Sequence, residues 1–471
     1  MSFPSISFLF YFLPAFFAIY FVVRGVTAKN FVLLLASLIF YAWGEPRFVL
    51  LLAMQAVVNY GAALAIDAAQ GSDRRLITAI GIAANLALLA VFKYADFAVD
   101  TLNTLAGASY LSRPGIALPL GISFFTFHAI SYLIDVHRGG VAASRNFLSI
   151  AVYIAMFPQL VAGPIVRYHT IARRLIARRT TLGRGSAGLR IFIIGLAQKV
   201  LIADEVARIA DTVFDKVAHP GFAEAWLGLC AYTIQIYFDF AGYSNMAIGL
   251  GLALGFAFPR NFRLPYAAES MTEFWRRWHI SLSQWLRDYL YIPLGGSRGS
   301  LAETYRNLCL VFVLCGLWHG AKWTCVIWGT HHGLFLVAER AGLARVLAGA
   351  PTLISRLYVL AAVMTGWVWF RANDFEQASA FFASLAGLRG WGGLSIGTHT
   401  VVQPLTIIAL LIGALLASVR LDIMGCVRFV PAPVARLAYG LADTGVIALF
   451  FVLSVLSVAA GAYSPFLYFR F

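Results

Sequence analysis

The chain has 471 residues, of which 61% are hydrophobic and 12% are charged. A soluble domain is about 25% charged, so this composition excludes an ordinary cytosolic enzyme and indicates lipid as the surrounding solvent. The formal net charge is +15, from 36 Lys and Arg residues against 21 Asp and Glu residues. In a soluble protein this excess would suggest nucleic-acid binding, but no nucleic-acid recognition module accompanies it. In a membrane protein the charge instead indicates which loops face the cytoplasm.

Apolar stretches recur along the whole chain. Ten are uninterrupted, at 6–23, 31–43, 48–66, 76–92, 116–134, 147–166, 241–258, 323–338, 401–419 and 445–469. Two weaker ones, 187–203 and 222–238, contain charged residues. A helix needs about 20 apolar residues to cross hydrocarbon, and backbone groups at that depth must bond internally. Hydropathy therefore predicts an all-α integral membrane protein, a polytopic bundle of about 11 to 13 membrane elements that forms one domain over 1–471.

Basic residues set the expected orientation. The first of them, Arg24, follows the first apolar run, which argues against a cleaved signal peptide. Together with Lys29 it places the N terminus outside. Residues 136–203 contain no acid but ten basic residues: Arg138, Arg145, Arg167, Arg173, Arg174, Arg178, Arg179, Arg184, Arg190 and Lys199.

If both flanks of 147–166 are cytoplasmic, this run enters the membrane and returns, with its break at Pro158 and Gly163-Pro164. We expect such a re-entrant element. The basic stretch holds its loops near anionic headgroups. An additional role, attraction of an anionic donor such as a phosphorylated coenzyme or an acidic carrier protein, is the alternative.

The polar interruption at 259–307 predicts an amphipathic segment at the cytoplasmic interface. Ser270 and Glu273 have capping-box spacing, so we expect a helix to begin there and to end at Pro293 and Gly295-Gly296. Helical spacing gives this segment an apolar face of Phe274, Trp278, Leu282, Trp285 and Tyr289, and a polar face of Arg276, His279, Ser283 and Arg287. An interfacial anchor would explain the Trp and Arg residues. The row of Arg, His and Ser residues on the polar face favours a catalytic role for this segment.

A second polar feature, Leu317-Trp-His-Gly-Ala-Lys322, interrupts the apolar region 308–339. Its His319 is either a packing residue or a working base, and inside membranes ionisable groups usually line a cavity. A His can accept a hydroxyl proton and return it. Gly316 and Gly320 would allow close helix approach or local distortion around it.

Further histidines, an acid in the apolar region and the cysteines are also candidate site residues. His331 and His332 lack the spacing of helical zinc pairs with His319, so no metal site is predicted. Asp239 lies between two apolar runs, where it would either hydrogen-bond a neighbouring helix or orient a catalytic His. The five cysteines lack paired spacing and are interpreted as packing residues: Cys230, Cys309, Cys315, Cys325 and Cys426.

These motifs resemble the membrane-bound O-acyltransferase family, and within it the branch of alginate O-acetyltransferase membrane subunits. The most specific matches are 273–291 and 317–321. Further matches are Phe40-Tyr-Ala-Trp43, Phe92-Lys-Tyr94, Pro119-Leu-Gly-Ile-Ser-Phe124, Ser131-Tyr132, Phe157-Pro158, Ala162-Gly-Pro164 and Tyr237-Phe-Asp-Phe-Ala-Gly-Tyr-Ser244.

The resemblance implies that His319 is catalytic and that His279, 40 positions earlier, is the second polar residue of the site. The supporting residues expected around them are Trp318, Arg276, Ser283, Arg287, Asp288, Asp239 and His332. A Trp is usual in this branch at the position of His331, which leaves that residue without an expected role.

The resemblance also implies a reaction. An acetyl group would pass from a cytoplasmic thioester, acetyl-coenzyme A or another acyl thioester, across the inner membrane of a bacterium towards an extracytoplasmic polysaccharide, with no bound cofactor. His319 would act as general base or, as the alternative, as a transient acyl carrier. His279 or nearby Arg and Trp donors would stabilise the oxyanion. A periplasmic esterase-like partner is expected to complete the transfer.

Several functions remain open at this stage. Alginate or a similar exopolysaccharide is the first choice of acceptor, peptidoglycan the second and D-alanylation of teichoic acid the third. A transporter or flippase for a lipid-linked sugar belongs to a different class and predicts inverted repeats. The Trp-rich segment has no repeat in the N-terminal half. The clustered histidines disfavour a non-catalytic scaffold.

Overall fold

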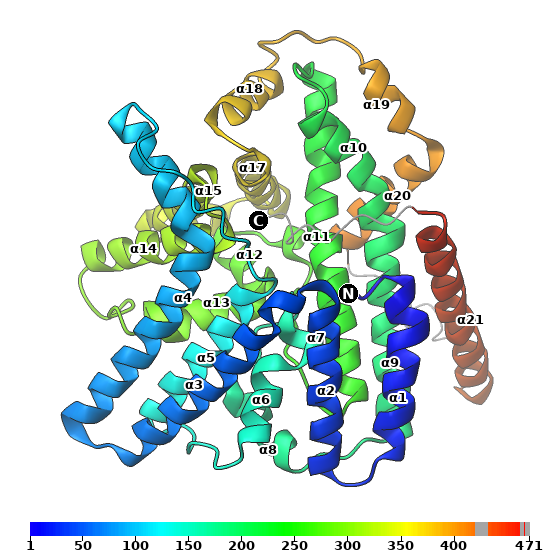
Figure 1. Cartoon of the computed structure of the whole chain (residues 1–471). Coiled ribbons are helices and arrows are strands. Elements are labelled where there is room, and N and C mark those ends of the chain that lie inside the picture. Colours follow the sequence, from blue (N-terminus) through cyan, green and yellow to red (C-terminus); the bar gives the residue numbers. More distant parts are fainter. Residues whose placement is uncertain (420–431, 462–465, 467–471) are drawn as a thin grey trace. The chain divides into compact units, whose positions relative to one another are not determined.

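The computed structural model describes residues 1–419, 432–461 and 466. It is 77% helical, and no strand occurs in the part of the chain that it describes (Figure 1). The predicted class, an all-α polytopic membrane protein, is confirmed. Seven of the described helical stretches are long and apolar enough to cross a membrane: Val26–Gly44, Pro46–Ala68, Gly71–Ala106, Leu182–Asp215, Leu301–His319, Thr352–Arg371 and Ala442–Ala459. Two further apolar helices, Ser7–Val22 and Pro404–Ser418, are shorter.

Contacts divide the chain into two compact units. The first comprises Met1–Leu189 and Ala247–Pro259, and the second comprises Arg190–Met246 and Arg260–Phe471. The division falls inside two helices, α9 (Leu182–Ala197) and α11 (Phe222–Ala253). The single domain expected over 1–471 stays a prediction.

The first unit holds the N-terminal helices. In chain order they are η1 (Ser7–Phe12), α1 (Leu13–Val22), α2 (Val26–Gly44), η2 (Pro46–Phe48), α3 (Val49–Ala68), α4 (Gly71–Ala106), α5 (Ile122–His137), α6 (Phe147–Ala155), α7 (Phe157–Leu160) and α8 (Tyr168–Ile176). Aromatic rings join three of them, because the ring of Phe157 lies 5.3 Å from that of Phe16 and 5.5 Å from that of Phe40. This packing holds the first apolar run against α2 and α7.

The apolar run at 147–166 is broken, as its Pro and Gly residues predict. Helix α6 has nine residues and α7 has four, with non-helical backbone at Met156 between them. At 1.5 Å per residue, neither can cross about 30 Å of hydrocarbon. The chain then turns and α8 contacts α6 (Figure 1). Most side chains of 147–166 are buried in protein, the condition under which irregular backbone is tolerated at membrane depth.

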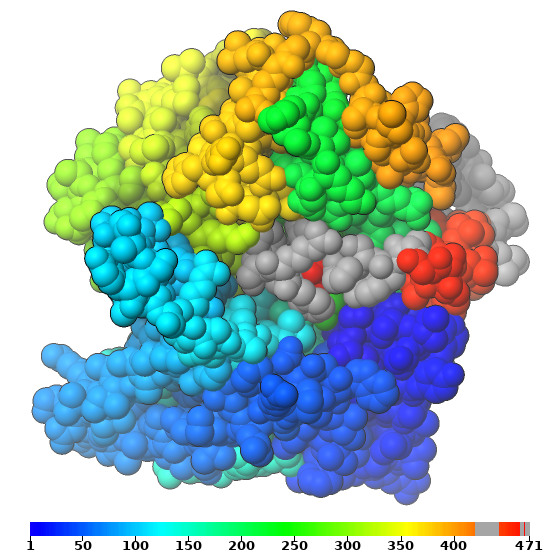
Figure 2. All heavy atoms as spheres, turned by 45° about the horizontal axis from the view of Figure 1, so that its top comes forward, coloured from blue at the N-terminus to red at the C-terminus, as the bar shows by residue number. Residues whose placement is uncertain are grey.

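The second unit holds the remaining helices. They are the end of α9, η3 (Gln198–Ala203), α10 (Asp204–Asp215), most of α11, η4 (Pro265–Ala267), α12 (Met271–Arg277), α13 (Ile280–Leu286), η5 (Arg287–Tyr291), α14 (Leu301–His319), α15 (Trp323–Ala338), η6 (Glu339–Leu343), α16 (Ala344–Gly349), α17 (Thr352–Arg371), α18 (Phe375–Leu385), α19 (Ile396–Val401), α20 (Pro404–Ser418) and α21 (Ala432–Ala459). Figure 2 shows the atoms of α10, in green, beside those of α18 and α19, in yellow and orange.

Contacts at the end of α10 fix the positions of α17 and α18. The rings of Phe214 and Phe381 stack with their centroids 4.1 Å apart. The buried guanidinium of Arg371, the last residue of α17, lies 3.0 Å from the Asp211 carboxylate and 2.5 Å from that of Asp215. These bonds hold the C-terminal end of α17, which contributes Phe370 to the candidate site described below.

Helix α11 shows that one sequence prediction is wrong. The sequence separates 222–238 from 241–258 at Asp239, whereas the helix runs unbroken from Phe222 to Ala253. Asp239 does not end it, because its carboxylate lies 2.6 Å from the Nζ atom of Lys199 in η3. A buried charge with an opposite partner costs far less free energy than an isolated one.

Helices α14 and α15 cross at backbone contact. A Cβ atom added to Gly316 would lie 2.2 Å from the carbonyl oxygen of Cys325, and one added to Gly329 would lie 2.1 Å from that of Phe312. Only glycine fits at both positions. The predicted close approach at Gly316 is therefore confirmed.

This crossing yields a stability prediction. We expect Gly316→Ala to lower the free energy of unfolding by about 1–3 kcal/mol or more, because the added methyl group meets backbone that cannot rotate away. Thermal unfolding of the purified protein measures the change. Gly61→Ala is the matched control, since a Cβ atom there meets nothing within 4 Å. Equal stability of the two variants would contradict the prediction.

Candidate active site

The candidate site lies where α14, α15 and α17 meet the segment between α12 and α13. His319 is the last residue of α14 and is 4% exposed. Its ring centroid lies 5.0 Å from that of Trp328 and 5.4 Å from that of Phe370. The ring of His279 lies 6.4 Å away. The two residues expected to carry the chemistry, 40 positions apart in sequence, are thus brought together.

Trp318 completes this group. Its ring centroid lies 4.8 Å from that of His319 and 6.2 Å from that of His279. The ring of Phe240, from α11, meets that of His279 edge-on, with the centroids 4.6 Å apart. Aromatic walls of this kind exclude water and strengthen polar interactions inside them.

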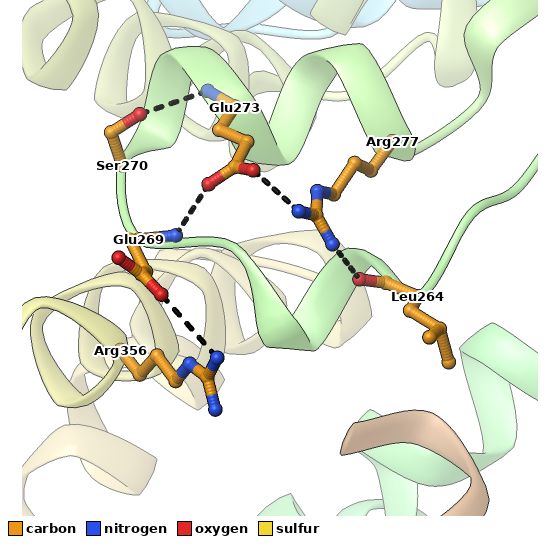
Figure 3. Close-up of polar contacts among 6 residues, drawn as sticks. All are labelled: Leu264, Glu269, Ser270, Glu273, Arg277 and Arg356. Atoms are coloured by element: carbon orange, nitrogen blue, oxygen red, sulfur yellow. Dashed lines mark hydrogen bonds and ion pairs between the residues drawn. The ribbon is translucent and has the colours of Figure 1, made fainter. Parts of the chain in front are cut away.

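The helix predicted to run from Ser270 begins where expected. Ser270 Oγ accepts a hydrogen bond from the backbone N–H of Glu273 at 3.0 Å. The Glu273 carboxylate accepts from the N–H of Glu269 and from Arg277 (Figure 3). In a standard capping box that carboxylate would accept from the N–H of Ser270 itself, so the reciprocal bond is shifted by one residue.

The same helix is not continuous, and this corrects the predicted polar face. His279 has φ 42° and ψ 54°, a left-handed conformation that separates α12 from α13. Such a conformation costs a non-glycine residue about 1–2 kcal/mol and marks functional sites. The break turns His279 into the interior, where it is fully buried. Arg276, Ser283 and Arg287 lie elsewhere, around a pocket.

Asn261 holds His279 in place. Its Oδ1 atom lies 3.1 Å from His279 Nδ1 and also accepts from the N–H and the hydroxyl of Ser281, at 3.2 and 2.9 Å. Because this oxygen only accepts, Nδ1 of His279 carries the proton. Burial lowers the pKa of His279 to about 3, so the ring is neutral at physiological pH and Nε2 presents a lone pair. In that state His279 cannot donate to an oxyanion.

Nε2 of His279 is buried and has no hydrogen-bond partner among the described residues. The same holds, within the described chain, for the indole Nε1–H of Trp275 and of Trp328. Buried polar groups are normally paired, and exceptions are typical of functional sites. His279 can therefore accept a hydrogen bond from a reacting group, and Trp275 and Trp328 can donate one.

His332, predicted as a supporting residue, is fully buried next to Trp328. Its ring centroid lies 4.9 Å from that of Trp328 and 5.2 Å from that of Trp275. Gly366 of α17 makes room for it, because a Cβ atom there would lie 2.9 Å from His332 Nε2. His331 points to α17 and lies 2.7 Å from the Ala362 carbonyl oxygen.

A pocket of about 510 Å³ adjoins this group of rings. Three predicted supporting residues line it, Arg276, Ser283 and Arg287, together with Arg340. The other lining residues are Thr272, Trp275, Ile280, Gln284, Leu286, Tyr291, Ser297, Leu308, Val311, Phe312, Cys315, Leu336, Glu339 and Ala344. The pocket therefore combines an apolar wall with three guanidinium groups.

Two lining residues also belong to the surroundings of the histidines. Cys315 lies one helical turn before His319 on α14. The ring of Trp275 faces the pocket and meets His332 edge-on. Trp275 thus connects the pocket wall to the buried rings.

The two predicted acids occupy different places. Asp288 accepts two hydrogen bonds from its neighbour Arg287, at 2.6 and 3.2 Å. Asp239 binds Lys199, which also lies 2.6 Å from Asp204. Of the two roles that the sequence left open for Asp239, the structure shows the bond to a neighbouring helix.

The cysteines are all single thiols where the structure describes them: Cys230, Cys309, Cys315 and Cys325. Only Cys315 and Cys325 are buried as expected for packing residues. Cys426 lies outside the described residues. No group of three His, Cys, Asp or Glu within the described ranges is arranged to hold a metal ion.

Sequence reasoning missed three contributors. Asn261 precedes its partner by 18 positions, and no local pattern connects them. Arg340 is one of several charged residues after α15. Glu339 is buried and accepts from the N–H groups of Met271 and Thr272 at 2.5 and 2.9 Å, which fixes the start of α12. A buried acid after an apolar run was the available signal for Glu339.

Comparison with known proteins identifies the family of this chain. The model of the membrane-bound O-acyltransferase family matches residues 89–362. The probable alginate O-acetylases AlgI of Azotobacter vinelandii and Pseudomonas putida are 42% and 41% identical to the chain, over the full length of both proteins. A peptidoglycan O-acetyltransferase of Helicobacter pylori is 39% identical over 83% of this chain and 80% of its own length. The chain therefore belongs to the membrane-bound O-acyltransferase family, and it is an O-acyltransferase.

Proposed function

We propose that the protein transfers an acetyl group from a cytoplasmic thioester, across the bacterial inner membrane, for O-acetylation of an extracytoplasmic polysaccharide. One observation carries the proposal: two buried histidines with rings 6.4 Å apart, one of them oriented by Asn261, lie next to a pocket lined by three Arg residues. The similarity to alginate O-acetylases supports alginate or a related exopolysaccharide as the acceptor.

In this mechanism His319 is the general base. It takes the proton of the acceptor hydroxyl while the hydroxyl oxygen attacks the thioester carbonyl carbon. The tetrahedral intermediate then collapses, the C–S bond breaks, and the thiolate leaves with the proton that His319 returns. His279, whose Nε2 offers a lone pair, accepts a hydrogen bond from a second hydroxyl of the acceptor and so orients the attacking one.

The oxyanion of the intermediate needs donors. Trp328 is suited to this role, because its ring touches that of His319 and its Nε1–H has no other partner in the described residues. A preformed donor in a site with little water stabilises developing charge strongly. Trp328 therefore takes the place of His279 as the proposed oxyanion donor, because neutral His279 offers only an acceptor at Nε2.

The pocket is the proposed donor site. A thioester donor carries phosphate groups, on coenzyme A or on the prosthetic arm of a carrier protein, and guanidinium groups bind phosphate well. Arg276, Arg287 and Arg340 supply three of them. The thioester end would have to pass Trp275 to reach His319, so we propose that this side chain moves when the donor binds.

On the other side of the membrane, a periplasmic esterase-like partner would receive the acetyl group and pass it to the polysaccharide. Peptidoglycan is the second candidate acceptor, favoured by the similarity to the Helicobacter pylori enzyme.

The donor assignment is tested by filling the pocket. In proteoliposomes supplied with radiolabelled acetyl-coenzyme A or an acetylated carrier protein, we expect Ser283→Trp to raise KM for the donor at least about tenfold, because a large side chain takes the donor's volume. Ser283→Ala is the matched control and should transfer acetyl normally. Unchanged KM in Ser283→Trp would contradict the donor site.

A further inference from the structure

The first unit contains a cluster of cations that the acyl transfer does not use. Arg178, after α8, donates to Tyr20 Oη at 3.0 Å and to Asn30 Oδ1 at 2.6 Å. Lys29, in the first turn of α2, donates to Thr180 Oγ1 at 3.0 Å. Its Nζ lies 5.1 Å from the centre of the Tyr20 ring, which also faces Arg178. The positive charges of Lys29 and Arg178 therefore both lie close to the Tyr20 ring.

The cluster is held by its own bonds. Tyr20 Oη donates to the Leu254 carbonyl at 2.9 Å, and Asn30 Nδ2 donates to the Leu175 carbonyl at 2.8 Å. At Gly255, with φ +90°, a Cβ atom would lie 3.3 Å from the side chain of Arg178. The α1–α2 turn, the α8–α9 loop and the end of α11 are thus locked together around the two cations.

The segments around these two cations supply no carboxylate to balance their charges. The segments that build the cluster lie within 1–44, 136–203 and 247–259, and none of these ranges contains an Asp or a Glu. Further basic residues, Arg24 and Arg179, adjoin Lys29 and Arg178 in sequence and are exposed. Two neighbouring cations without a carboxylate repel each other, so an external anion would stabilise the arrangement.

The surroundings indicate that this anion is at the membrane surface. The cations lie at the ends of apolar helices, where the α1–α2 turn and the start of α9 come together (Figure 1). Apolar side chains beside them are largely exposed: Val22 by 80%, Ile176 by 71% and Leu182 by 92%. Exposed apolar residues flanking basic ones are typical of the boundary between acyl chains and headgroups.

We infer that Lys29 and Arg178 form a binding site for the phosphate of an anionic phospholipid in the cytoplasmic leaflet. The phosphate group would lie between the ammonium and the guanidinium, and its acyl chains would cover the exposed side chains of Ile176 and Leu182. The bound lipid would hold the α1–α2 turn to the loop before α9. This site is separate from acyl transfer and does not depend on the proposed function.

The test uses full-length protein purified in detergent, with phosphatidylglycerol or phosphatidylcholine added before native mass spectrometry. We expect the wild type to retain phosphatidylglycerol preferentially. Lys29→Gln should lower that retention about five-fold, the effect of one basic side chain near an anionic surface. Arg75→Gln removes the same charge from an exposed position at the start of α4 and should leave retention unchanged.

Arg178→Gln should also lose phosphatidylglycerol, but it breaks the bonds to Tyr20 and Asn30, so Lys29→Gln is the decisive variant. Equal retention by the wild type and Lys29→Gln, or an equal loss in Arg75→Gln, would overturn the site. Inorganic phosphate distinguishes the two sources of the anion. If it displaces phosphatidylglycerol and by itself stabilises the wild type but not Lys29→Gln, the ligand is a soluble phosphate and the lipid assignment is overturned.

Discussion

Replacement of His319 by Ala is expected to abolish polysaccharide O-acetylation while the protein stays in the membrane at normal abundance. The imidazole is the proposed base, and loss of a general base lowers rates by about 10² to 10⁴-fold. The measurement is the acetyl ester content of the polysaccharide in a deletion strain that expresses the variant, with immunoblotting of membranes for abundance.

His331→Gln is the matched control for this variant. His331 is also a histidine of the same helical pair, but its ring bonds to the Ala362 carbonyl oxygen of α17. A Gln side chain can make the same bond, so acetylation should stay close to wild type. Retained acetylation in His319→Ala would exclude a catalytic role for that residue, whereas equal loss in both variants would indicate a structural defect of α14 and α15.

A second large effect is expected at His279. His279→Asn should lower acetyl transfer at least about 10²-fold, because the imidazole lone pair that orients the hydroxyl is removed. Asn tolerates the left-handed backbone conformation better than most residues, so the break between α12 and α13 should persist. The measurements are kcat in proteoliposomes and the unfolding temperature. Loss of both would show that His279 serves folding instead.

The Asn261→Asp variant tests whether Asn261 orients the His279 ring or only packs against it. A carboxylate at this position favours the protonated imidazole and raises the pKa of His279. In the wild type that pKa is lowered to about 3 by burial, so His279 stays neutral down to mildly acidic pH. Activity that requires neutral His279 is lost as the pH falls through the pKa of this residue. Because Asn261→Asp raises that pKa, the loss of activity moves to higher pH.

The pH profile of kcat/KM measures the shift. Asn261→Asp should be active at alkaline pH and should lose activity at a higher pH than the wild type. A merely structural role of Asn261 would lower activity equally at every pH. Ser281→Ala is the control, since it removes one bond to the same oxygen without adding charge.

Local signals were enough to predict the membrane class and several helix boundaries, whereas the pairing of His319 with His279 came from the resemblance to a family. Apolar runs of spanning length act through transfer to lipid, which depends on composition and not on tertiary partners. The cap at Ser270 and the break at Pro158 are likewise effects within a few residues. The motif around His319 is local too, because a polar group inside an apolar run is costly wherever the run packs.

Only the tertiary structure decided how those residues are used. Periodicity placed His279 on one face with Arg276 and Ser283, but the left-handed backbone at 279 and the bond to Asn261 turned it inward. Asp239 interrupted the apolar pattern without ending α11, because Lys199 from another helix neutralises it. Each of these outcomes depends on a partner far away in sequence. A one-dimensional pattern records that a buried polar group needs a partner, and the fold determines which partner it finds.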